Sequence, residues 1–76
     1  MTLRILTPTT GSEHTAEAVF LPGAAGAFEV LKGHAPLIST LVKGEIRWRD
    51  AAGEHSHPLE SGAVMVENDI ITVCAE

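Results

Sequence analysis

Glu45-Ile46-Arg47-Trp48-Arg49 is the stretch that decides the fold class. Apolar and charged residues alternate along it with a period of two, which is the period of a β-strand and not of a helix. In a strand, Ile46 and Trp48 lie on one face and the three charged side chains lie on the other. We therefore predict a strand that is buried on one side, with Trp48 as an anchor of the core.

The residues that follow this strand indicate a hairpin. Residues 50–53, Asp-Ala-Ala-Gly, supply the turn, and residues 55–60 supply the returning strand. Pro58 has no backbone N–H to donate, so the returning strand should lie at a sheet edge or carry a bulge. A second hairpin is predicted at residues 67–69, Glu-Asn-Asp.

Glycine, proline, asparagine and aspartate divide the rest of the chain into short segments. None of these segments is long enough for an ordinary helix, and several are rich in β-branched residues. The sequence predicts an all-β protein, a two-sheet β-sandwich of about eight to ten short strands that forms a single domain over residues 1–76. In residues 3–6 and 19–21 the apolar residues do not alternate cleanly, so we expect both faces of those strands to be shielded from water.

Composition narrows the class of partner. The 76 residues are 45% hydrophobic, which is enough for a globular core. A domain of this size buries only about 60% of its unfolded surface, so docking on a larger partner would stabilise it. The net charge is −5, and the five basic residues are dispersed along the chain. Such a surface repels phosphate backbones, so no nucleic acid partner is predicted.

The sequence gives no sign of direct membrane insertion. No apolar run approaches the length that spans a bilayer, and the first residues lack the core of a signal peptide. Cys74 is the only cysteine, so no internal disulfide can form, and a reducing compartment fits best.

Several short motifs together resemble the epsilon subunit of F-type ATP synthases. In chain order they are Leu-Pro-Gly at residues 21–23, Gly-Ala-Phe at 26–28, Gly-His-Ala-Pro-Leu at 33–37, Lys-Gly-Glu-Ile-Arg at 43–47 and Ser-Gly-Ala at 61–63. Residues 64–76 resemble the closing strand pair of that family. The resemblance extends over most of the chain from Ala18 onward.

The resemblance implies a function as well as a fold. The amino-terminal domain of the family is a flattened β-sandwich on the central rotor, in contact with the gamma subunit and the ring of c subunits. By this resemblance the chain is a noncatalytic central-stalk subunit that links gamma to the c ring and couples ion translocation to ATP synthesis. It would need no cofactor and would lie peripherally at the cytoplasmic face of a bacterial inner membrane.

The resemblance also implies interface residues. The candidates for contact with the c ring and gamma are Gly26, Ala27, Phe28, Glu29, Gly33, His34, Ala35 and Pro36. We expect residues 26–37 to face the membrane ring, with Pro36 stiffening the loop and His34 offering an adaptable hydrogen bond. The family usually reads Gly-Glu-Phe-Gly where this chain has residues 26–29, so the acidic group is displaced to Glu29.

The sequence ends at Glu76, where most members of the family continue into a helical hairpin. In many relatives that hairpin restrains ATP hydrolysis, and in some it binds ATP. Neither activity is therefore expected of this chain.

A small cupin-like metal protein is the alternative interpretation. His55 and His57 would lie on one face of a strand, with Glu60 as a possible third ligand. In an unbroken strand, however, Glu60 falls on the opposite face, and no later histidine completes the set. The serines lie in no recognisable nucleophile motif, so no catalytic residue is predicted.

Overall fold

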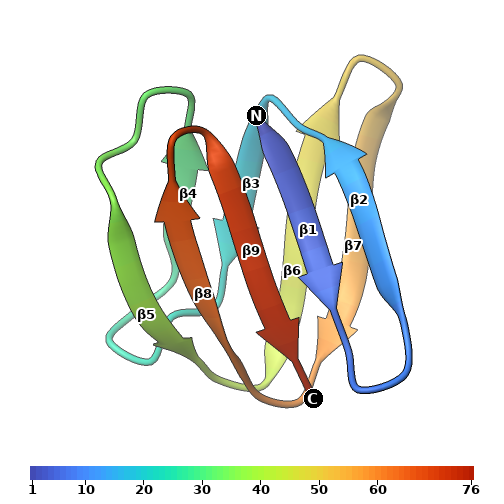
Figure 1. Ribbon diagram of the computed structural model, residues 1–76, viewed down its shortest axis with the longest axis vertical. Helices are drawn as coiled ribbons and strands as arrows, with labels where there is room; N and C mark the ends of the chain where they lie inside the picture. The colour runs from blue at the N-terminus through green and yellow to red at the C-terminus, as the bar shows by residue number, and fades with distance from the viewer.

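The computed structural model describes all 76 residues and contains nine strands and no helix (Figure 1). The strands are β1 (Thr2–Leu6), β2 (Gly11–Thr15), β3 (Ala18–Leu21), β4 (Phe28–Leu31), β5 (Leu37–Leu41), β6 (Gly44–Asp50), β7 (Gly53–Leu59), β8 (Gly62–Glu67) and β9 (Ile70–Ala75). The predicted all-β class and the predicted number of strands are both confirmed.

The strands form two sheets that pack face to face. The five-stranded sheet has the order β2-β1-β9-β8-β5, and the four-stranded sheet has the order β4-β3-β6-β7. β1 and β9 pair in parallel, with Leu3 opposite Ile71, whereas all other neighbouring strands are antiparallel. The first and last strands therefore hold both ends of the described chain in one sheet.

The core lies between the sheets and consists of the residues that each strand turns inward. Ile46 is fully buried and Trp48 is 5% exposed, while Arg47 and Arg49 lie exposed on the other face of β6. This is the arrangement that period-two alternation predicts. Fifteen buried residues from both sheets form one cluster. Each large aliphatic side chain contributes about 1.5–3 kcal/mol when fully buried, so this cluster is what holds the sheets together.

Two hairpin turns show how local sequence sets the strand pairing. Asn68 and Asp69 both have positive φ, 52° and 59°, which suits a two-residue type I′ turn between β8 and β9. Between β6 and β7, Asp50 Oδ1 accepts a hydrogen bond from Ala52 N at 2.8 Å. Asparagine and aspartate favour such turns because their short side chains bond to the nearby backbone. Both predicted hairpins are confirmed.

The expectations about individual strands have different outcomes. β7 is the outer strand of the four-stranded sheet, so Pro58 lies at an edge as predicted. The expectation for residues 3–6 is wrong at its centre, because Arg4 is exposed between two buried residues. In β3, Phe20 is half-buried with the guanidinium of Arg47 5.3 Å from its ring centroid. The chain's own residues therefore shield the outer face of β3 only in part, so the expectation for residues 19–21 is met in part.

Candidate partner-binding surface

The connection between β3 and β4 is a tight turn. Gly26 N donates to Gly23 O at 3.0 Å, and Ala24 N donates to Thr40 O at 2.9 Å, which ties the turn to β5. A Cβ atom at Gly23 would lie 2.6 Å from Gly26 O and 2.8 Å from the ring of Phe28, so only glycine fits there. The sequence thus builds a compact turn with a fixed shape.

The connection between β4 and β5 carries the Gly-His-Ala-Pro motif. Gly33 has a φ of 81°, a conformation that residues with a Cβ rarely adopt. Its N–H donates to Asp69 Oδ1 at 2.7 Å. His34 N donates to Leu31 O at 3.0 Å, and His34 Nδ1 lies 2.7 Å from Ala35 O. The hydrogen bond from Gly33 ties the loop to the turn between β8 and β9, and the two contacts of His34 stabilise the loop internally.

The predicted interface residues separate into two groups at opposite ends of β4. Figure 1 places the turn of residues 22–27 at one end of the sandwich and the loop of residues 32–36 at the other. Most of the side chains in both groups are exposed, and only Phe28 and His34 are half-buried. The eight residues therefore belong to two surfaces and do not form one site.

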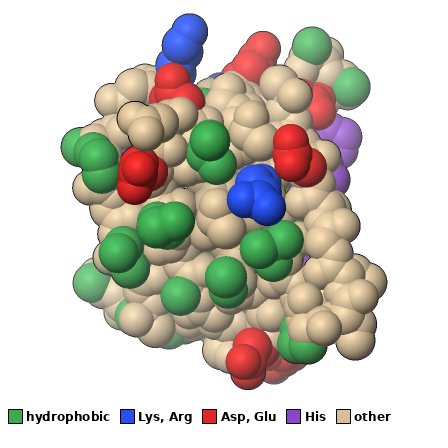
Figure 2. All heavy atoms as spheres, viewed as in Figure 1, with side chains coloured by type: hydrophobic (Ala, Val, Ile, Leu, Met, Phe, Trp, Pro, Cys, Tyr) green, Lys and Arg blue, Asp and Glu red, His purple; other side chains and the backbone are tan.

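The outer face of the five-stranded sheet carries exposed hydrophobic side chains. Ile38 is 81% exposed, Met65 is 46% exposed and Ile70 is 44% exposed. Ile38 pairs with Met65, and Met65 pairs with Thr72, so β5, β8 and β9 all contribute. Figure 2 shows hydrophobic side chains spread over this side of the molecule, with basic and acidic side chains among them. We call this surface, including the exposed Cys74, the apolar face.

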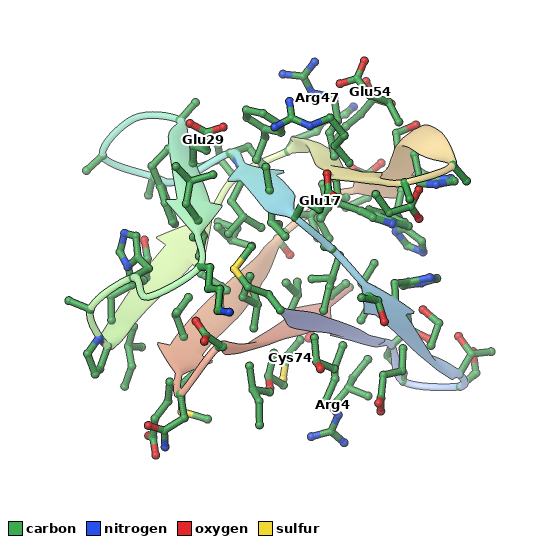
Figure 3. All side chains as sticks on the ribbon, turned by 90° about the horizontal axis from the view of Figure 1, so that it is seen from above. Arg4, Glu17, Glu29, Arg47, Glu54 and Cys74 are labelled. Atoms are coloured by element: carbon green, nitrogen blue, oxygen red, sulfur yellow. The ribbon has the colours of Figure 1, made fainter.

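The outer face of the four-stranded sheet is different. Its exposed charged residues are Glu29, Glu45, Arg47, Arg49 and Glu54. Figure 3 shows Glu29, Arg47 and Glu54 projecting from one side of the sandwich, with Arg4 and Cys74 on the other. We call this surface the charged face. The two sheets thus present contrasting surfaces to possible partners.

The family comparison identifies the fold's relatives. Residues 1–76 match the family described as the β-sandwich domain of the ATP synthase delta/epsilon chain. The chain belongs to this family. The resemblance that the motifs indicated is confirmed, and so is the prediction of a noncatalytic subunit.

Curated relatives of this delta/epsilon-chain domain are ATP synthase epsilon chains. The epsilon chain of Prochloron didemni is 36% identical over 74 residues, which are 96% of this chain and 54% of the relative. That of Prochlorococcus marinus (strain MIT 9303) is 38% identical and covers 96% of this chain and 56% of the relative. That of Citrifermentans bemidjiense is 44% identical over 54 residues, 71% of this chain and 39% of the relative. The chain spans about half the length of these epsilon chains.

Solved structures agree on the fold of the delta/epsilon-chain domain. A chain in the mitochondrial ATP synthase of Euglena gracilis, solved with OSCP, F1 and c-ring, superposes with a TM-score of 0.87 at 16% identity. That match covers 96% of this chain and 48% of the other. A chain in the central stalk and c-ring of the Tetrahymena thermophila mitochondrial enzyme gives a TM-score of 0.76 at 12% identity, covering 97% and 61%.

Sequence reasoning missed the hydrophobic residues of the apolar face. Ile38, Met65 and Ile70 all fall on the outward parity of strands whose inward residues are also apolar. The adjacent pair Ile70-Ile71 carries the signal, because two neighbouring apolar residues in a strand must point to opposite faces. The alternation of inward-facing and outward-facing residues in β8 and β9, taken together, is the signal that predicts this surface.

The metal-binding alternative finds little support in this family's fold. His55 and His57 share one face of β7, as their parity predicted, since His55 lies opposite the inward-facing Trp48. Their nitrogens, however, have other neighbours. His55 Nε2 lies 3.0 Å from Asp50 Oδ2, and His57 Nδ1 lies 2.8 Å from Pro58 O. No group of three or more His, Cys, Asp or Glu side chains could hold a metal ion, and the family match replaces the cupin-like interpretation.

As to membranes, the structure contains no helix with the length and apolar character needed to cross one.

Proposed function

We propose that this chain is the β-sandwich of a noncatalytic central-stalk subunit that links the gamma subunit to the c ring of a rotary F-type ATP synthase. In this role it keeps ion translocation coupled to ATP synthesis, at the cytoplasmic face of a bacterial inner membrane. The observation that carries the proposal is the apolar face on a sandwich of the delta/epsilon-chain family. A packed sandwich transmits force well, because its close-packed interior resists deformation.

The gamma subunit is the partner that we assign to the apolar face. Exposed hydrophobic side chains on three neighbouring strands favour association, because burying them removes apolar area from water. A hollow between Pro36, Ile38, Met65 and Glu67 joins this face to the Gly-His-Ala-Pro loop. The loop residues Gly33, His34, Ala35 and Pro36 are therefore assigned to the same partner.

The c ring is the partner that we assign to the opposite end of β4. The turn there presents Gly26, Ala27 and Glu29, with Phe28 packed beneath them against the core. Its hydrogen bonds and the close fit at Gly23 keep it rigid, which suits a contact that bears load. This assignment narrows the expectation that all of residues 26–37 face the ring, because the two ends of β4 point away from each other.

Thiol labelling of Cys74 tests the gamma assignment. Cys74 is the only cysteine and lies exposed on the apolar face, so a maleimide should label it readily in the free chain and much more slowly once gamma is bound. The matched control is Ser56→Cys in a Cys74→Ser background, because Ser56 is exposed on the charged face. Equal protection of both positions, or protection of neither, would contradict the assignment.

Crosslinking in the assembled complex tests the c-ring assignment. In a Cys74→Ser background, Ala27→Cys should crosslink to cysteines in the polar loops of the c ring, whereas His34→Cys should crosslink to gamma. Ala27 is exposed, and His34 is half-buried in a loop and is not part of the core, so neither substitution should disturb the core. Ring products from position 34 and none from position 27 would reverse the orientation.

A further inference from the structure

Asp69, in the turn between β8 and β9, makes hydrogen bonds to two segments that lie far from it in the chain. Its carboxylate oxygen Oδ1 accepts a bond from the backbone N–H of Gly33 at 2.7 Å, across 36 residues of sequence. Its carbonyl oxygen accepts a bond from the backbone N–H of Thr2, the first residue of β1, at 2.9 Å. One residue therefore joins the turn to β1 and to the Gly-His-Ala-Pro loop, and Figure 1 shows all three at the same end of the sandwich.

The bond to Gly33 is the only hydrogen bond that joins residues 32–36 to another element of the fold. The other two hydrogen bonds of this loop are local, from His34 N to Leu31 O and between His34 Nδ1 and Ala35 O. Packing does not fix Gly33, because a Cβ atom there would have no heavy atom beyond its chain neighbours within 4 Å. Between the flanking strands, the carboxylate of Asp69 is therefore the loop's one hydrogen-bonded attachment.

The side chain of Asp69 is well suited to this contact. The residue has a φ of 59°, a conformation that aspartate and asparagine tolerate in turns. The three ion pairs of the chain join other residues, so no cation competes for this carboxylate. A carboxylate accepts stronger hydrogen bonds than a neutral carbonyl does. The bond to Gly33 is thus a specific interaction of this side chain and not a by-product of the turn.

The loop that Asp69 holds borders the apolar face. Ile70, which is 44% exposed on that face, follows Asp69 directly in the chain. A hollow lined by Pro36 of the loop and by Ile38 and Met65 of the face lies between the two. A binding surface made of two segments needs both of them held in the right relative position before the partner arrives. The bond from Asp69 fixes that relative position.

We infer that Asp69 is a positioning residue of the gamma-binding surface. Its carboxylate holds residues 33–36 beside the apolar face, so that the loop and the face meet gamma as one surface. The inference rests on the proposed function, because gamma is the partner assigned there. Without this bond the loop would have to become ordered during binding, and the entropy lost at that moment would weaken the complex. Asp69 acts through the loop and does not itself need to touch gamma.

Two substitutions at position 69 separate the carboxylate from the turn. Asp69→Gly removes the acceptor and leaves an Asn-Gly pair, which is a preferred sequence for type I′ turns, so the hairpin should still form. Asp69→Asn removes the charge but keeps a side-chain oxygen that can accept the same bond. Asn68→Gly is the matched control, because it changes the other positive-φ residue of the turn, whose side chain bonds only to the neighbouring Glu67.

Amide hydrogen exchange in the free chain tests the bond itself. In Asp69→Gly, the N–H of Gly33 should exchange about tenfold faster than in the unmodified chain, because its acceptor is gone. Asp69→Asn and Asn68→Gly should stay within about threefold of the unmodified rate. Unchanged exchange in Asp69→Gly would overturn the inference, because the loop would then be held without the carboxylate.

Isothermal titration with gamma tests the consequence for binding. Asp69→Gly should bind roughly fivefold more weakly than the unmodified chain, whereas Asp69→Asn and Asn68→Gly should bind like it. In a His34→Ala background, Asp69→Gly should cost less, because both substitutions act through the same loop.

Three binding results would overturn the positioning role: unchanged affinity in Asp69→Gly, full additivity with His34→Ala, or an equal loss in Asp69→Asn, which would mean that the charge contacts gamma directly. A different result identifies a failure of the proposed function. If the unmodified chain did not bind gamma although Gly33 exchanged as expected, the assignment of gamma would be wrong, and the positioning role would fall with it.

Discussion

The two outer faces of the sandwich differ in the side chains that they expose to solvent. On the charged face, the guanidinium of Arg47 lies over the ring of Phe20 and partly covers it. On the apolar face, Ile38 is largely uncovered, and Met65 and Ile70 are each a little under half exposed. The charged face also has one exposed hydrophobic side chain, Leu31, which is 48% exposed. The apolar face has three, so it gains more from a partner than the charged face does.

The exposed hydrophobic residues of the apolar face lie close to one another. Ile38 lies directly opposite Met65, and Ile70 lies on the next strand of the same sheet, so these residues are clustered and not scattered singly. Scattered surface hydrophobics are ordinary, but contiguous ones mark interaction sites. The chain's net charge of −5 opposes nonspecific self-association, and specific docking is the use that we propose for this surface.

The largest effect is expected from charge on the apolar face. Ile38→Asp should weaken gamma binding by about 2 kcal/mol or more, roughly thirtyfold, because it places an unpaired carboxylate in a desolvated interface. The melting temperature of the free domain should change little, since Ile38 is 81% exposed. Isothermal titration with gamma and thermal unfolding of the free domain measure the two quantities.

The matched control for this substitution is Ser56→Asp, which adds the same charge to the charged face. It should leave gamma affinity unchanged within error. If both variants lost affinity equally, net charge and not the apolar face would be responsible, and the contrast between the faces would not hold.

A substitution on the charged face is expected to have a smaller effect, and that effect is on stability and not on gamma binding. Arg47→Ala removes the guanidinium above Phe20 and should lower the free energy of unfolding by about 0.5–1 kcal/mol, with no change in gamma affinity. Urea unfolding measures the first quantity and titration the second. Arg49→Ala is the control, because it removes the same charge from the same strand and face. A loss of gamma affinity in Arg47→Ala would show that the charged face also takes part in docking.

Much of this fold was predictable because it depends on local sequence. The alternation around Ile46 and Trp48 fixed which side of β6 is buried, and Pro58 placed β7 at an edge. The Asn68-Asp69 pair marked a hairpin through its tolerance of positive φ. In each case the residues that determine the structural feature lie in the same short segment as the feature itself.

The surfaces were harder to predict because they depend on segments far apart in the chain. The motif residues at 26–29 and 33–36 are neighbours in sequence, yet β4 carries them to opposite ends of the sandwich. The polar sequence around His14 shows no partner for this residue, but its ring lies against that of Trp48 in β6. Such contacts follow from the order of strands in two sheets, which periodicity alone does not give.

The smallest effect concerns Asp50, where the four-stranded sheet stabilises its own hairpin. The hydrogen bond from His55, with further bonds from the backbone at Ala52 and Gly53, lowers the pKa of Asp50 in the folded chain below its ordinary value of 3.8. A lowered pKa means that the stabilisation is complete above the ordinary value and is lost as the pH falls through the folded-state value. Asp50→Asn should therefore destabilise the domain slightly at about pH 6, and this difference should shrink toward strongly acid pH. Urea unfolding across this range measures it, with Glu54→Gln as a neighbouring control, and gamma affinity should be unaffected. A difference that persisted unchanged in acid would mean that Asp50 acts through its shape and not through its charge.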